Sequence, residues 1–249
     1  MGTNYGALCS DFYVNQKLAL KMDLPSDRET ILHMMDQVRK VMPTMNRFRR
    51  YEHELALESS RRNEEYRWLA IRRTSIRTGH VNPSSMEESY RLHRLVLDII
   101  PYHLTVSPLD VDYLDLMFGF DLACSGNHDA IVFEALYRNS AVEHLLGING
   151  ASILNVQPMF GITLSDRVDM QAFFEVKTRT KNRRGMAPAR RDEPISIFLT
   201  VRRFGPIDKI EELPTIFEDM ARHANDLASD QLVHNLLMPI ARHIPSSST

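Results

Sequence analysis

The sequence predicts an α+β fold built on antiparallel sheets. Segments in which apolar residues alternate, as in half-buried strands, are interspersed with segments in which they recur at helical spacing. The first half orders these segments as strand, helix, two strands, helix and strand, which is the ferredoxin-like βαββαβ unit. The second half orders them as helix, three strands and helix, a smaller α-β-β-β-α unit. We therefore expect a ferredoxin-like domain at residues 10–124 and a second α+β domain at residues 125–243.

The strands of the first half are predicted from alternation along the chain. Residues 10–23 place apolar and polar side chains on opposite faces, and residues 110–124 show the same pattern over a longer run. Residues 49–59 and 66–78 are typical of two further strands, and the polar segment between them is typical of a turn. These four strands supply the β elements of the ferredoxin-like unit.

The two helices of the first half are predicted from their start signals. Ser26 with Glu29, and Ser85 with Glu88, have the spacing of a capping box, in which hydroxyl and carboxylate satisfy free backbone N–H groups. Apolar residues at helical spacing follow each pair, and a proline follows each apolar run. We therefore expect one helix after each capping box.

The second half is predicted to hold a hairpin, a further strand and three helices. Asn127 is the expected cap of the first helix, and alternation predicts that Phe160, Ile162 and Val168 face the core from the hairpin. The predicted strands span 153–164, 168–181 and 195–204, and the predicted helices span 128–146, 214–228 and 230–242. The order is compatible with a second domain packed on the first, or with a single continuous sheet.

Composition limits the location and the class of partner. The 30 basic and 32 acidic residues nearly balance, whereas dedicated nucleic-acid binders usually show a marked basic excess. The two cysteines form no spaced pair, which favours a reducing compartment. No apolar stretch approaches the roughly 20 residues of a membrane-spanning helix, and the first ten residues lack the pattern of a signal peptide. We therefore expect a cytoplasmic protein with no membrane partner.

The segment KTRTKNRRGMAPARR, residues 177–191, concentrates basic side chains without any acidic one. It lies in a predicted hairpin loop, residues 177–194, which is longer than the usual two to five residues. Because arginine forks suit phosphate and carboxylate groups, the loop is a candidate contact for an anionic partner or for an acidic neighbouring subunit. A solvated loop is the alternative. The candidate binding residues are Lys177, Arg179, Lys181, Arg183, Arg184, Arg190 and Arg191.

A second basic region lies between residues 47 and 77, where arginines are interleaved with glutamates. Cross-strand Arg–Glu pairs are the simpler interpretation. Trp68 and Tyr66, beside Arg67, are also the ingredients of a surface on which bases stack. A ferredoxin-like sheet can bind single-stranded RNA in this way, so Trp68 and Tyr66 are candidate stacking residues.

Three functions follow from these observations. The chain contains no nucleophile, phosphate-loop or dinucleotide motif, so we expect no cofactor or metal and assign no catalytic residue. The first hypothesis is a non-catalytic binding or assembly protein, a homo-oligomer that uses the basic loop. The alternative is an RNA-binding or RNA-processing protein, because tandem ferredoxin-like domains resemble the architecture of CRISPR-associated RNA endonucleases, although their glycine-rich loop near the C-terminus is missing. The third is an enzyme acting on an anionic small molecule.

Overall fold

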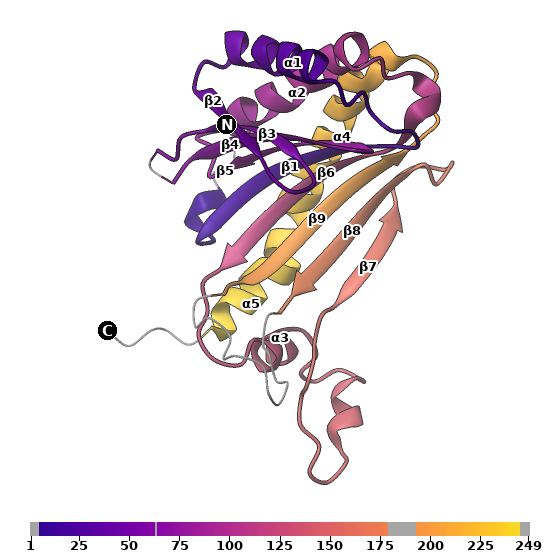
Figure 1. The fold of residues 1–249 in the computed structure, drawn as a ribbon. Helices are drawn as coiled ribbons and strands as arrows, with labels where there is room; N and C mark the ends of the chain where they lie inside the picture. The colour runs from indigo at the N-terminus through magenta and orange to yellow at the C-terminus, as the bar shows by residue number, and fades with distance from the viewer. Residues whose placement is uncertain (1–4, 63, 179–192, 245–249) are drawn as a thin grey trace.

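One large antiparallel sheet organises the protein, whose computed structural model describes residues 5–62, 64–178 and 193–244. Its strands are β1 (Asp11–Leu20), β2 (Met45–Arg50), β3 (Leu55–Ser59), β4 (Tyr66–Arg72), β5 (Ser75–Val81), β6 (Val111–Leu122), β7 (Met159–Thr163), β8 (Met170–Lys177) and β9 (Ile195–Phe204). They lie in the order β2-β3-β4-β5-β1-β6-β9-β8-β7 (Figure 1). The α+β class and the antiparallel pairing are therefore confirmed.

The ferredoxin-like arrangement is not confirmed, because the first half contains two more strands than predicted. The segment predicted as one strand at 49–59 turns back where the N–H of Tyr51 donates to the carbonyl of Glu54 at 2.9 Å, so β2 and β3 form a hairpin. The segment at 66–78 also turns back, between β4 and β5. The resulting four-strand meander returns to β1 from the edge of the sheet, and this gives a strand order different from the ferredoxin-like one.

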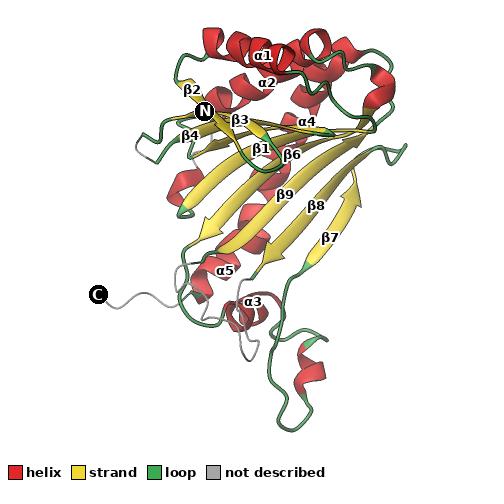
Figure 2. Ribbon diagram, viewed as in Figure 1, coloured by secondary structure: helices red, strands yellow, loops and turns green. Residues whose placement is uncertain are grey.

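The long helices lie on one face of the sheet (Figures 1 and 2). They are α1 (Arg28–Val41), α2 (Met86–His103) and α4 (Leu213–Leu227); the shorter α3 (His128–Leu136) and α5 (Met238–His243) pack against each other. Ser85 caps α2 as predicted, because its hydroxyl accepts the N–H of Glu88 at 3.2 Å. The cap of α1 is Asp27 rather than the predicted Ser26, since the Asp27 carboxylate accepts the N–H of Thr30 at 2.8 Å.

Both halves of the chain contribute to one hydrophobic core between the sheet and the helices. Phe118 and Phe120 of β6 and Leu199 of β9 are fully buried on the helix side. Phe217 of α4 packs edge-on against Tyr90 of α2, with ring centroids 5.5 Å apart. The sheet runs without interruption from β1 through β6 to β9, so strands on both sides of residue 124 belong to one continuous sheet.

The strand β7 is shorter and more exposed than the sequence predicts. Only Met159–Thr163 of the predicted strand at 153–164 pairs with β8. The prediction that Phe160, Ile162 and Val168 face the core is wrong, because all three side chains are exposed. Phe160 and Ile162 lie on the helix face of β7, but the described helices that would have to cover this end of the sheet lie elsewhere (Figure 1). Val168 instead belongs to the turn before β8, which begins at Met170 rather than at the predicted residue 168.

The helical segments of the second half also differ from their predicted bounds. The helix capped by Asn127 ends at Leu136, although the prediction continued it to residue 146. A π-helical segment, Ala228–Leu237, joins α4 to α5 without the break predicted near Ser229. Among the helices of the described residues, none is both long and apolar enough to cross a membrane.

The two halves repeat one order of elements. In the first half, β1 is followed by α1, the meander β2 to β5, and α2; in the second, β6 is followed by α3, the meander β7 to β9, and α4. Each meander ends beside the strand that opened its half, so the antiparallel pair β1 and β6 forms the middle of the sheet. Within the described residues, the second meander has no counterpart of β2, the outermost strand of the first.

Candidate functional site

The face of the sheet opposite α1, α2 and α4, which we call the open face, carries none of the described helices (Figures 1 and 2). Side chains alternate between the two faces along each strand. On β1, Phe12 and Val14 are buried on the helix side, whereas Tyr13, Asn15 and Lys17 are half-buried on the open face. The open face is therefore a broad surface that is available to a ligand.

Aromatic rings on the open face extend across neighbouring strands and lie over glycines. A Cβ atom on Gly79 would come within 2.3 Å of the Trp68 indole, and a Cβ atom on Gly119 would come within 2.2 Å of the Tyr13 ring. Because glycine has no side chain, it lets the rings approach the backbone. The rings of Trp68 and Tyr13 are half-buried, so part of each ring stays accessible.

Phe173 repeats this arrangement in the second half, where a Cβ atom on Gly161 would lie 2.9 Å from its ring. The strand register places Trp68 and Phe173 in the same cross-strand row, five strand spacings or about 24 Å apart. The two residues lie equally far from the central pair β1 and β6. We call this row the aromatic row; it contains Trp68, Gly79, Asn15, Met117, Thr200 and Phe173.

A second row, the cationic row, lies two residues further along each strand, about 7 Å from the aromatic row. In it Arg77 is opposite Lys17, Lys17 is opposite Asp115, and Asp115 is opposite Arg202. Three cations and one carboxylate give the row a positive charge, although the whole chain carries a formal charge of −2. The positive charge of this row therefore lies beside the aromatic row, whose two ends carry the rings of Trp68 and Phe173.

Lys17 and Arg77 are the two cations of this row that form no ion pair with any residue that the structure describes. Lys17 Nζ lies 2.6 Å from the hydroxyl of Tyr113, and the Arg77 guanidinium lies 5.4 Å from the centre of the Trp68 ring. Burial and, to a smaller extent, repulsion from Arg72 lower the pKa of Arg77. Like charges directly opposite each other destabilise a strand pair, so an anion bound between Lys17 and Arg77 would relieve the repulsion.

Arg202 is instead neutralised within the row. Its Nε and Nη2 atoms donate to the two oxygens of Asp115 at 2.6 and 2.8 Å, and this bond raises the pKa of Arg202. Its guanidinium also lies 4.1 Å from the centre of the Tyr113 ring. A bidentate pair with a carboxylate fixes the guanidinium in place. Arg202 is therefore a positioned part of the surface rather than an unpaired charge.

The structure describes three of the residues that the sequence singled out for binding. Trp68 and Tyr66 lie on β4 on the open face, and Tyr66 is 5.9 Å from the Arg61 guanidinium. Lys177 is exposed at the end of β8 and forms an ion pair with Glu175 at 3.2 Å. The remaining candidates lie outside the described residues: Arg179, Lys181, Arg183, Arg184, Arg190 and Arg191.

The basic region between residues 47 and 77 divides into paired and unpaired arginines. Arg72 of β4 bonds Glu54 at 2.7 Å, and Arg67 bonds Glu65 at 2.7 Å, so part of the region consists of the expected Arg–Glu pairs. The arginines of the edge strand β2 form no ion pair with the described part of the chain; they are Arg47, Arg49 and Arg50. Unpaired positive charge is therefore also present at this edge of the sheet.

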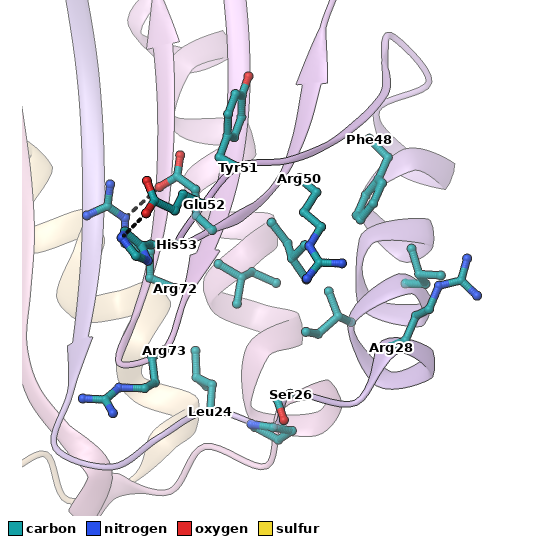
Figure 3. A pocket seen from close by; sticks show the side chains of 16 residues that line it. Leu24, Ser26, Arg28, Phe48, Arg50, Tyr51, Glu52, His53, Arg72 and Arg73 are labelled. Carbon is teal, nitrogen blue, oxygen red and sulfur yellow. Dashed lines mark hydrogen bonds and ion pairs between the residues drawn. The ribbon is translucent and has the colours of Figure 1, made fainter.

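A pocket of about 480 Å³ lies between the β2–β3 hairpin and the start of α1 (Figure 3). The Arg50 side chain points into it, and its lining includes the apolar Leu55 and Ile71. Arg72 on its rim is held by Glu54. The pocket therefore combines an apolar wall with an arginine that has no described carboxylate partner.

The open face offers aromatic rings and positive charge to a ligand. Within residues 5–62, 64–178 and 193–244, no group of three or more His, Cys, Asp or Glu side chains is arranged to hold a metal ion. The rings offer surfaces for stacking, and the cations of the cationic row offer charge to an anion. Stacking on the rings and attraction of an anion by the cations need no cofactor.

Sequence reasoning found Trp68 but missed Tyr13 and Phe173. Alternation shows that both residues point away from the core, so their strand faces are predictable. That each ring covers a glycine depends on which residues are opposite each other, and this register is set by turns and by strand order. The missing signal was therefore the pairing of strands that are distant in the sequence.

Comparisons with known proteins add no assignment. The chain matches no protein-family model, and no curated protein is significantly similar to it. The open face and the pocket are therefore the features from which a function is inferred.

Proposed function

We propose that the protein binds single-stranded nucleic acid, in particular RNA, across its open face. The observation that supports this proposal is the aromatic row beside a cationic row in which Lys17 and Arg77 have no described carboxylate partner. Stacking of a base on an aromatic side chain contributes about 1–3 kcal/mol and tolerates any base. Bases on Trp68 and phosphates near Lys17 and Arg77 would use both rows at once.

A local positive surface is sufficient for this function in a chain whose charges nearly balance. Affinity for nucleic acid depends on the phosphates neutralised at the contact surface, not on the net charge of the whole protein. Single-stranded RNA is the expected ligand, and single-stranded DNA of the same sequence tests whether contacts to the 2′-hydroxyl contribute.

The basic loop and the assembly state belong to the same proposal. We expect Arg183, Arg184, Arg190 and Arg191 to contact phosphates or an acidic region of a neighbouring subunit in a homo-oligomer. Replacing these four arginines by glutamine should reduce the slope of log affinity against log salt by about 3, because each phosphate contact on a single strand contributes about 0.7. We also propose a cytoplasmic location, which agrees with the free thiols of the two cysteines.

The direct test is the binding of a fluorescein-labelled RNA of about 12 nucleotides, followed by fluorescence anisotropy at several salt concentrations. Trp68→Ala should weaken binding by about 5- to 150-fold, the equivalent of one lost stacking contact. The double variant Lys17→Gln with Arg77→Gln should reduce the salt slope by about 1.4.

Matched controls lie on the helix side of the molecule. Tyr102→Ala removes an exposed aromatic ring of α2, and Arg91→Gln removes an exposed charge of the same helix, so neither should change affinity. If the wild-type protein does not raise the anisotropy of the labelled RNA at low salt, the proposal is wrong. If RNA binds but Trp68→Ala leaves its affinity unchanged, the open face is not the binding surface.

A small anionic molecule with an apolar body is a second candidate ligand, and the pocket of Figure 3 favours it. Arg50 would pair with the anionic group while Leu55 and Ile71 contact the apolar part. Benzoate is a suitable probe: calorimetry should detect binding that Arg50→Ala removes and Trp68→Ala preserves. Absence of heat with the wild-type protein at millimolar benzoate would exclude this class of ligand from the pocket.

A further inference from the structure

The two edges of the sheet differ in charge. The edge strand β2 carries Arg47, Arg49 and Arg50, whereas the other edge strand, β7, has the sequence MFGIT and contains no charged residue. Natural sheets place charges on edge strands to prevent pairing with another sheet. The β2 edge follows this rule and the β7 edge does not, so β7 has the properties of a strand that pairs with a partner.

The side chains of β7 are exposed and apolar. Met159 is 63%, Phe160 is 53% and Ile162 is 40% exposed. Phe160 stacks on Phe174 of β8 with ring centroids 5.0 Å apart, which holds it in position while its outer side stays accessible. Phe160 and Ile162 lie on the helix face and Met159 on the open face, so both faces of this sheet edge carry exposed apolar side chains.

The exposed apolar surface continues into the segment that leads to β7. Leu145, Ile148 and Leu154 of this segment are exposed, and together with Phe133 and Tyr137 its residues line a hollow of about 550 Å³. The segment extends beyond the end of the sheet in Figure 1. A partner at the β7 edge would therefore find further apolar surface beside the strand.

We infer that the partner is a second copy of this chain, whose β7 pairs with β7 antiparallel about a two-fold axis at Gly161. In that register Phe160 of each copy is opposite Ile162 of the other, so these cross-strand pairs on the helix face are apolar. On the open face, Met159 of each copy is opposite Thr163 of the other. The contact is self-complementary and closed, as in a symmetric dimer.

The alternative pairings of sheet edges are less favourable. Two β2 strands would bring the arginines of both copies together, and like charges in opposite positions destabilise a strand pair. Pairing of β2 with β7 would offer the arginines no carboxylate and would leave a free edge on each copy, which produces an open filament. The β7–β7 dimer alone leaves only charged edges exposed. This inference does not rest on nucleic-acid binding.

The test measures the mass of the full-length protein by light scattering from about 1 to about 100 µM. The wild-type protein should be a dimer at the upper concentrations. Phe160→Glu and Ile162→Lys, made separately, should each weaken dimerisation by at least about 100-fold, because each places two unpaired charges in the interface. Circular dichroism should show unchanged secondary structure, since both positions are exposed in one copy.

The combined variant, Phe160→Glu with Ile162→Lys, distinguishes this register from general apolar association. Each introduced carboxylate would be opposite an introduced ammonium group of the other copy, so the dimer should return. Phe48→Lys, an equally exposed apolar position on β2, is the control and should leave the dimer unchanged. A wild-type monomer at 100 µM, a dimer insensitive to both single changes, or a combined variant that stays monomeric would each overturn the inference.

Discussion

Burial in this fold lowers the pKa of two histidines. His80 of β5 and His93 of α2 are both fully buried between the sheet and the helix layer. The Thr78 hydroxyl lies 2.6 Å from His93 Nδ1 and 2.7 Å from the Gln16 side-chain oxygen, so His93 belongs to a buried polar network. Burial lowers the pKa of His80 to about 4 and that of His93 to about 3, and Arg67 adds to the effect at His80. Both imidazoles are therefore neutral at pH 7.

Stability should fall between pH 6.5 and pH 5 because of these two residues. Their pKa in the unfolded chain is about 6.5, so as the pH falls the unfolded state binds protons first and is favoured. As the pH falls through this range, each histidine lowers the free energy of unfolding by up to about 1.4 kcal/mol per pH unit. Urea unfolding at a series of pH values measures the slope.

His93→Gln should reduce this slope, even though it also lowers stability at pH 7. The control is His53→Gln, which replaces a histidine whose side chain is 82% exposed and should leave the slope unchanged. A free energy of unfolding that is constant from pH 7 to pH 5 would contradict the assignment of both histidines as buried and neutral.

Gly79 is a residue at which one added carbon atom should destabilise the protein. In Gly79→Ala the new Cβ atom would meet the Trp68 ring at 2.3 Å, so the ring must move. The expected cost is about 1–3 kcal/mol, as for other overpacked sites, measured by urea unfolding. In a Trp68→Ala background the same change should cost much less, because the two positions are in contact. Equal costs in both backgrounds would show that the ring does not lie over Gly79.

At the scale of elements, the sequence predicts the regular segments well and the tight turns poorly. The predicted strand at 195–204 coincides with β9, and Met170, Ala172, Phe174 and Val176 of β8 are buried as alternation predicts. The hairpin turn within 49–59 was missed because Tyr51 and His53 continue the alternation of Leu55 and Leu57. The turn within 66–78 was missed because its residues, Arg73 and Thr74, are not typical turn residues such as Gly, Pro, Asn or Asp. A missed turn changes the number of strands, and this is why the strand order differed from the expected one.

The start of α2 offers a test of an element predicted correctly. Ser85→Ala removes the hydroxyl that accepts the N–H of Glu88, and the expected loss is about 1 kcal/mol of stability. Ser84→Ala changes the neighbouring exposed serine, which makes no capping bond in the described structure, and should change stability by less than about 0.5 kcal/mol. Thermal unfolding of the two variants side by side measures the difference; equal losses would mean that Ser85 does not cap the helix.

At the scale of the molecule, the order and register of the strands decide which side chains lie in one row across the sheet. The aromatic row joins residues from six strands, and Trp68 and Phe173 share it only because of the register of the five strand pairs from β4 to β8. No local pattern near either residue contains this information. The candidate stacking residue Trp68 was therefore predictable as a residue type in a basic region, whereas the surface to which it belongs was not.

The continuous sheet and the shared core predict one cooperative unfolding transition. Trp68 is the single tryptophan and lies in the first half, so its fluorescence reports on that half, whereas far-UV circular dichroism reports on the whole chain. The two signals should change at the same urea concentration. Two separated transitions would instead mean that residues 10–124 and 125–243 unfold as independent units.

The position of β1 and β6 in the middle of the sheet has a consequence during synthesis. Lys17 and Tyr113, which bond each other across these strands, are 96 residues apart in the chain. At roughly 5–20 residues per second, the ribosome needs about 5 to 20 s to make the interval between them. Throughout that delay β1 has a neighbour on one flank at most, so a nascent chain stalled before residue 111 should aggregate or recruit a chaperone more readily than one stalled after residue 122.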